Sequence, residues 1–167
     1  MRIFDVEKCR KLANEKGEEK SMTEFMKIFQ ELLDDNNLTI RSFSEKSGIP
    51  FQVLYSYKNQ DYYPTLSIAE KIANYFGCSF NYLFGIDDYL QREDFKPMNI
   101  ALFYPRYISL LEKNKVSHYF LYKRIGLNNS SITKWKRGAI PKVESLKLIA
   151  EYFNVSIDYL VGRSDNY

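Results

Sequence analysis

The chain has 167 residues, of which 45% are hydrophobic, and 24 basic residues outnumber 21 acidic ones to give a net charge of +3. This composition is typical of a folded protein with one or two hydrophobic cores. A single histidine, His118, and two cysteines, Cys9 and Cys78, exclude a structural zinc site and a disulfide-stabilised scaffold, and they leave His118 as the only centre around which a catalytic triad could be built.

Residues 1–21 carry mixed charges and place Val6, Cys9 and Ala13 at helical spacing. This pattern predicts a helix or an arm before the first domain. Asp5 stands where a secretory signal peptide would be apolar. No segment of the sequence approaches the roughly 18 apolar residues of a transmembrane helix. We therefore expect a cytoplasmic protein that makes no contact with a membrane.

Two segments of the chain, 22–86 and 101–163, repeat one pattern of residues. The identities lie at an offset of 78 in the first half of the unit and 77 in the second half, with the shift between Lys58 and Pro64. A one-residue change of this kind belongs in a loop. The recurring residues of the first copy are Leu32, Leu33, Asn36, Gly48, Lys58, Pro64, Ile72, Ala73, Tyr75, Phe76, Ser79, Tyr82, Leu83 and Gly85. The sequence therefore predicts two copies of a unit of about 65 residues, a size that can fold alone.

Each copy has the pattern of several short helices, and no stretch shows the strict alternation that is typical of strands. In the second copy, Gly126 can end a helix in the left-handed conformation that glycine tolerates. Amphipathic spacing over 146–153 matches the spacing over 69–76 in the first copy. The predicted fold class is all-α, with two tandem five-helix domains joined by a linker at 87–100 and followed by a tail at 164–167.

Two short helices joined at a glycine form a helix-turn-helix, and the second copy carries a longer motif around that glycine. The motif includes Ser117, His118, Leu121, Ile125, Gly126, Leu127, Asn128, Asn129, Ser130, Ser131, Ile132, Thr133, Lys134, Trp135, Lys136, Arg137 and Gly138. It closely resembles the Cro and phage-repressor (XRE, lambda repressor-like) family over the whole unit, and the first copy resembles the family in its scaffold. The resemblance implies a five-helix domain whose third helix enters the major groove of DNA.

The resemblance also implies which side chains contact DNA. The positions that read bases in the family correspond to His118, Asn129, Ser130 and Lys134. Asparagine can bond adenine, lysine can donate to guanine, and serine can donate or accept. The positions that contact phosphate correspond to Lys115, Ser117, Lys136, Arg137 and Lys142. The residues alone leave other roles open, because Asn129 and Ser130 could serve only as helix caps, and His118 and Lys134 could be ordinary surface residues.

Charge separates the two copies. Residues 101–163 contain 11 Lys and Arg against four Asp and Glu, whereas residues 22–86 contain five against seven. Phosphate neutralisation dominates affinity for DNA, so the second copy is the predicted DNA reader. The aligned region of the first copy is apolar and aromatic, which is typical of a protein interface. The candidate interface residues are Ile40, Phe51, Gln52, Tyr55, Tyr62 and Tyr63.

These features predict a transcriptional regulator, a bacterial or phage repressor, that reads double-stranded DNA with the second copy and uses the first copy for dimerisation or contact with a protein partner. One alternative is a covalent pseudo-dimer with both copies on adjacent half-sites. Another is an anti-repressor or antitoxin-like module that binds a protein without reading bases. We expect no enzymatic activity, metal or cofactor, because no nucleophile–base pair, phosphate-binding loop or metal cluster stands out in the sequence.

Overall fold

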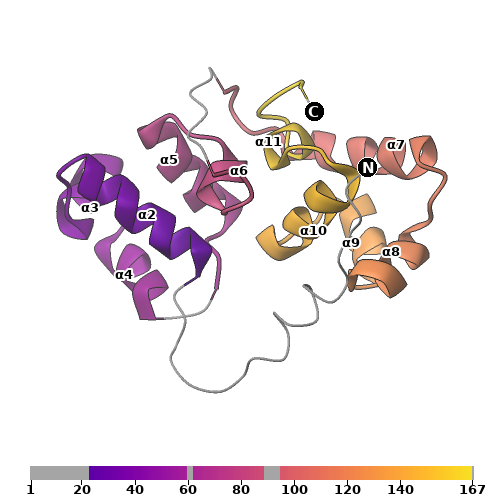
Figure 1. The fold of residues 1–167 in the computed structure, drawn as a ribbon, viewed down its shortest axis with the longest axis horizontal. Coiled ribbons are helices and arrows are strands. Elements are labelled where there is room, and N and C mark those ends of the chain that lie inside the picture. The colour runs from indigo at the N-terminus through magenta and orange to yellow at the C-terminus, as the bar shows by residue number, and fades with distance from the viewer. Residues whose placement is uncertain (1–22, 60–61, 89–94, 167) are drawn as a thin grey trace.

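The structure, a computed structural model, describes residues 23–59, 62–88 and 95–166 (Figure 1). Every regular element within these ranges is a helix, so the prediction of an all-α fold is confirmed for this part of the chain. The predicted arm at 1–21 and residues 89–94 of the predicted linker lie outside the described residues.

The first bundle is built around aromatic side chains. Its helices are α2 (Glu24–Asp35), α3 (Ile40–Ser47), α4 (Phe51–Asn59), α5 (Leu66–Phe76) and α6 (Phe80–Leu83). α2 begins where the Thr23 hydroxyl accepts a hydrogen bond from the backbone N–H of Met26. α3 ends at Gly48, whose φ of 68° favours glycine. Phe29 and Phe43 pack edge-on with ring centroids 5.3 Å apart, and this contact joins α2 to α3.

The second bundle repeats the same order of helices. After a 3-10 helix at Ile100–Leu102 come α7 (Phe103–Lys113), α8 (His118–Ile125), α9 (Ser131–Lys136), α10 (Val143–Phe153) and α11 (Ile157–Leu160). The Ser117 hydroxyl caps α8 by accepting from the Phe120 N–H at 3.1 Å. Gly126 ends α8 at a φ of 77°, as the sequence predicts for this glycine. Trp135 is buried and packs edge-on against Phe103 at 5.1 Å, which anchors α9 on the bundle.

The last helices of the two bundles, α6 and α11, pack against each other (Figure 1). The Phe80 N–H of α6 donates to Asp158 Oδ2 at 2.7 Å, and the Ile157 N–H of α11 donates to Asn81 Oδ1 at 2.8 Å. Phe80 and Ile157 are equivalent positions of the repeat, as are Asn81 and Asp158, because both pairs are 77 residues apart. Each copy therefore completes the first turn of the other's helix, as in a twofold contact between identical subunits.

A buried arginine strengthens this junction. Arg163 is 1% exposed, and its guanidinium donates to Asp158 Oδ1 at 2.5 Å and to Asn74 Oδ1 of α5 at 2.9 Å. The same guanidinium lies over the Phe80 ring, 4.3 Å from its centroid. Burial raises the pKa of Asp158, and Arg163 and the backbone N–H groups of Phe80 and Asn81 act in the opposite direction. Removing either partner of such a buried pair leaves the other charge uncompensated.

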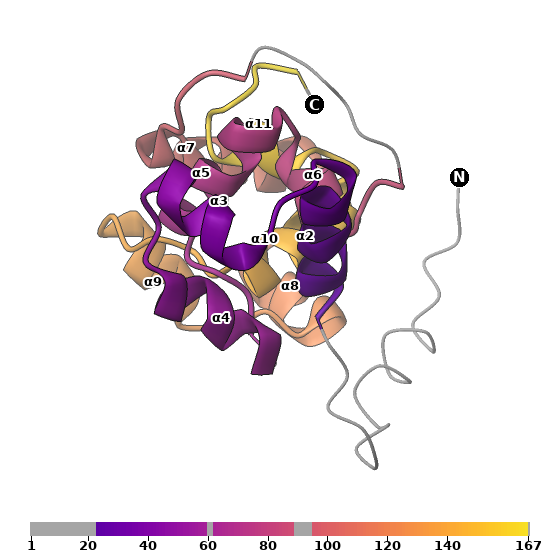
Figure 2. The same cartoon turned by 90° about the vertical axis from the view of Figure 1, so that its left-hand side faces the viewer.

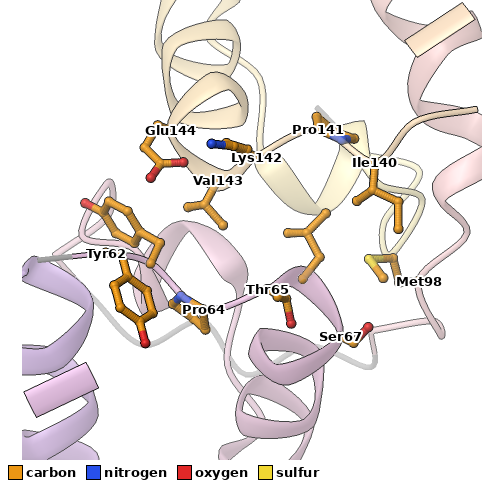
Figure 3. A pocket seen from close by; sticks show the side chains of 12 residues that line it. Tyr62, Pro64, Thr65, Ser67, Met98, Ile140, Pro141, Lys142, Val143 and Glu144 are labelled. Carbon is orange, nitrogen blue, oxygen red and sulfur yellow. The ribbon is translucent and has the colours of Figure 1, made fainter. Parts of the chain in front are cut away.

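A cavity of about 400 Å³ lies between the bundles, where α5 and α10 begin (Figure 3). Its walls include three pairs of equivalent positions, which are Pro64 with Pro141, Thr65 with Lys142, and Leu66 with Val143. Lys147 of α10 joins the bundles in this region by donating to the Tyr63 hydroxyl at 3.0 Å and to the Phe84 carbonyl at 2.7 Å. The cavity therefore lies at the axis that relates the two copies.

The twofold relation sets the direction in which the helices of the two copies face. Figures 1 and 2 show α4 and α9 below α6 and α11. The helix that follows the turn in each copy therefore lies on the same side of the α6–α11 contact.

Candidate nucleic-acid interface

The start of α9 presents polar side chains to solvent. The Asn128 side chain closes the turn before α9, because its Oδ1 accepts from the Ser130 N–H at 2.9 Å and from the Ser130 hydroxyl at 2.8 Å. Asn129 is exposed beside it. Lys134 is exposed one turn further along α9. Asn129, Ser130 and Lys134 are thus all exposed at and after the start of α9, and their contact with bases stays a prediction.

His118 occupies a different kind of place. It is 6% exposed, its Nδ1 lies 2.6 Å from the Tyr107 hydroxyl, and its Nε2 lies 3.2 Å from the Asn128 carbonyl. Its ring also packs edge-on against Trp135 at 5.8 Å. Both ring nitrogens are thus engaged inside the domain, and this burial contradicts the expectation that His118 reads bases. Its place in the structure is to join α7, α8 and the turn before α9.

The candidate phosphate contacts surround α9. Lys115 and Ser117 are exposed in the turn that leads into α8, and the uncompensated N–H groups at a helix start favour an anion. Lys136 and Arg137 are exposed at the end of α9, and Lys142 is exposed just before α10. Exposed basic residues therefore lie before and after Asn129 and Lys134 along the chain, and their contact with phosphate stays a prediction.

Sequence reasoning assigned no role to an aromatic group on α8. Tyr119, Phe120 and Tyr122 are 57%, 44% and 37% exposed. The Lys123 ammonium lies 5.6 Å from the Tyr119 ring centre and 4.9 Å from that of Tyr122. No spacing rule marks these residues in the sequence, since α8 buries only His118 and Leu121 and leaves the aromatic residues on its exposed side. The group places apolar surface and positive charge beside the turn that precedes α9.

The corresponding surface of the first copy is aromatic and mostly exposed. On α4, Phe51 and Tyr55 stack with centroids 5.4 Å apart, and Gln52 is exposed beside them. The Arg41 guanidinium of α3 lies 5.1 Å from the centre of the Phe51 ring, and Ile40 is half-buried next to Arg41 in the chain. These residues of the predicted protein interface are therefore gathered around the start of α4.

The two tyrosines of the predicted interface lie elsewhere. Tyr63 accepts from Lys147 at the junction of the bundles. The Tyr62 hydroxyl lies 2.9 Å from the Ser56 hydroxyl, and both tyrosines line the cavity between the copies (Figure 3). The predicted patch is thus divided between an outward surface on α4 and a contact inside the molecule.

Comparison with known proteins agrees with this arrangement. A helix-turn-helix family model matches residues 29–83 and residues 108–160. No curated protein and no solved structure matches the chain. In the described ranges, no helix has the length and apolarity that a membrane crossing requires. The same part of the chain contains no cluster of three or more His, Cys, Asp or Glu residues placed to hold a metal ion.

Proposed function

Because the chain belongs to the Cro/C1-type (XRE) helix-turn-helix family through two tandem copies, a family of DNA-binding regulators, we propose that it is a sequence-specific repressor of bacterial or phage origin that acts in the cytoplasm. The second copy reads double-stranded DNA through α9. The observation that carries this proposal is the exposed face of Asn129, Ser130 and Lys134, with exposed basic residues before and after it.

The chemistry of this face suits the major groove. Asn129 can bond the N6 and N7 positions of adenine, Lys134 can donate to O6 or N7 of guanine, and Ser130 adds a hydroxyl to either. Lys115, Ser117, Lys136, Arg137 and Lys142 then hold the phosphates and set the position of α9 on the duplex. A protein held in this way over a promoter excludes the polymerase from the same DNA.

The first copy contributes by pairing. Its α6 packs against α11 of the second copy through the reciprocal bonds of Asn81 and Asp158. The sequence predicts that the first copy serves dimerisation or contact with a protein partner. In this proposal, that partner is the second copy of the same chain.

The reading face is tested by Lys134→Ala in the full-length protein. Lys134 is exposed, so we expect the variant to fold normally and to lose about 1–3 kcal/mol of discrimination at one base position. Selection from random-sequence duplexes, followed by affinity measurement on the selected site and its single-base variants, measures this loss. Lys71→Ala is the matched control, because Lys71 is exposed on α5 of the first copy.

Two results would contradict the proposal. If Lys134→Ala and Lys71→Ala show the same base preference as the unmodified protein, α9 is not the reading helix. If the unmodified protein selects no sequence at all, the chain is a protein-interaction module that keeps the fold without reading DNA.

A further inference from the structure

The cavity between the copies has the size of a site for a small molecule. Its volume of about 400 Å³ falls within the range of roughly 300–1,000 Å³ that is typical of such sites. Figure 3 shows residues 62–67 of the first copy on one side of the cavity and residues 140–144 of the second copy on the other. A molecule bound in this cavity would therefore contact both copies.

The buried walls of the cavity are apolar. Pro64 and Leu66 are buried on the side of the first copy, and Pro141 and Val143 are buried on the side of the second. The two prolines have no backbone N–H, so they offer a ligand no hydrogen-bond donor. These walls suit the apolar body of a ligand, such as a branched aliphatic chain or an aromatic ring.

Two opposite charges lie at the rim of the cavity. Lys142 and Glu144 both line it and are both exposed, and among the described residues neither of them forms an ion pair. The Thr65 hydroxyl of the first copy also lines the cavity, and it does not cap the start of α5. The rim therefore presents a cation, an anion and a hydroxyl with which a ligand can form hydrogen bonds.

These features specify the chemical class of the ligand. A molecule that carries only a carboxylate would bring a like charge towards Glu144, and a molecule that carries only an amine would bring one towards Lys142. A zwitterion with an apolar side chain matches both charges and the apolar walls. We propose that the cavity binds an apolar or aromatic amino acid, whose carboxylate pairs with Lys142 and whose ammonium pairs with Glu144, and that this ligand weakens the binding of DNA.

The effect on DNA follows from Lys142, which is also one of the proposed phosphate contacts. The carboxylate of the ligand neutralises the charge of Lys142, so the ligand and DNA each weaken the binding of the other. A saturating ligand should lower the affinity for DNA by about 5-fold or more, and it should reduce the slope of log affinity against log salt by about one. This consequence rests on the proposed function, whereas the binding of the ligand does not.

Calorimetric titration of the full-length protein without DNA tests the site, with L-leucine, L-phenylalanine and L-tryptophan as probes. At least one of them is expected to bind with a Kd of about 1 mM or lower, as a ligand of this size can. For the probe that binds, the analogue without the ammonium and the analogue without the carboxylate should each bind at least about 5-fold more weakly, because each lacks one charge-assisted contact.

A pair of glutamine variants locates the site. Glu144→Gln removes the partner of the ammonium, so it should weaken binding of the amino acid by about 5- to 10-fold without weakening that of the analogue that lacks the ammonium. Glu151→Gln is the matched control and should bind the amino acid as the unmodified protein does, because Glu151 is exposed on the same helix and does not line the cavity. Thermal unfolding of both variants shows that any loss is not one of folding.

The outcomes separate the site from its effect on DNA. If none of the three amino acids binds, or if Glu144→Gln and Glu151→Gln bind the amino acid equally well, the assigned site is overturned. If the amino acid binds at the site but leaves the affinity for a selected duplex and its salt slope unchanged, the effect on DNA is overturned and the site stands. If the unmodified chain selects no DNA sequence, the proposed function fails, and calorimetry alone decides whether the site exists.

Discussion

At the scale of single residues, His118 shows how one side chain can link three segments. Its two ring nitrogens face the Tyr107 hydroxyl and the Asn128 carbonyl, and its ring packs on Trp135. It lies at the start of α8, yet it is buried because Tyr107 of α7 lies opposite it. The side chain therefore holds the turn that carries Asn129 and Ser130 against the rest of the domain.

The substitution His118→Ala tests this role. It leaves the buried Tyr107 hydroxyl without its partner and opens a cavity beside Trp135, whereas the Asn128 carbonyl still accepts from the Ser131 N–H at 3.0 Å. We therefore expect a loss of about 2–4 kcal/mol in the free energy of unfolding. Urea denaturation followed by tryptophan fluorescence measures it, since Trp135 is the only tryptophan. Full stability together with a lost base preference would instead make His118 a reader of bases.

The roles of individual residues were predictable where they depend on local chemistry. Ser117 as a cap, Gly126 as a helix end and Trp135 as a core residue all follow from residue type and position, and the structure confirms them. Cys78 is buried, as expected for a small apolar residue, and burial raises its pKa to about 12. The burial of His118 depends on Tyr107, eleven residues earlier in the chain. No local sequence pattern predicts that contact.

At the scale of elements, α6 and α11 are too short to be stable alone. Each has four residues, which is far below the length at which an isolated helix forms in water. Ser79 and Ser156 cap them from within their own copies, and Asp158 and Asn81 add acceptors from the opposite copy. Each helix is thus held by residues of both bundles.

The substitution Asp158→Ala tests this mutual support. It removes the acceptor of the Phe80 N–H and leaves Arg163 as a buried charge without its carboxylate, so we expect a loss of about 3–5 kcal/mol in the free energy of unfolding. Asp165→Ala is the matched control and should have little effect, because Asp165 pairs with Lys96 and Arg106 at the exposed surface. Chemical denaturation compares the two. Equal losses would mean that the α6–α11 contact does not hold the copies together.

Most helices could be predicted from the sequence, but the contact between α6 and α11 could not. The amphipathic spacing over 69–76 and 146–153 falls within α5 and α10, because those helices bury one continuous stripe. The reciprocal bonds of Asn81 and Asp158 join residues far apart in the chain. Asn81 and Asp158 look like surface positions in the sequence, so only the packed structure reveals them as buried caps.

At the scale of the whole molecule, the positive charge of the second copy is divided between two uses. Arg106 donates to the Tyr159 and Ser164 carbonyls and pairs with Asp165, while Lys147 and Arg163 serve the junction. These three residues count toward the basic total of the sequence without facing the proposed DNA surface. The difference in charge between the copies favours the second copy as the DNA reader. The number of basic residues in that copy nevertheless exceeds the number that could contact phosphate.

The dependence of DNA affinity on salt distinguishes the two uses. Arg137→Ala should weaken binding to every sequence alike and reduce the slope of log affinity against log salt by about one. Arg106→Ala should leave that slope unchanged, because its guanidinium is bound to carbonyls and a carboxylate of the same chain. Titrations on one duplex between low and physiological salt measure both slopes. If both variants reduce the slope equally, the salt dependence reports total charge, and the assignment of Arg137 to phosphate is contradicted.

Because Asp158 of the second copy caps α6 of the first copy, the first domain cannot be completed before the second copy has been synthesised. A ribosome makes Phe80 long before Asp158, which is 78 residues further along the chain. At about 5–20 residues per second, that interval lasts roughly 4–16 s. Until it ends, the Phe80 N–H has only water to bond, and the last turn of the first domain lacks its acceptor. The first domain to be synthesised is thus completed only after nearly the whole of the second has followed it.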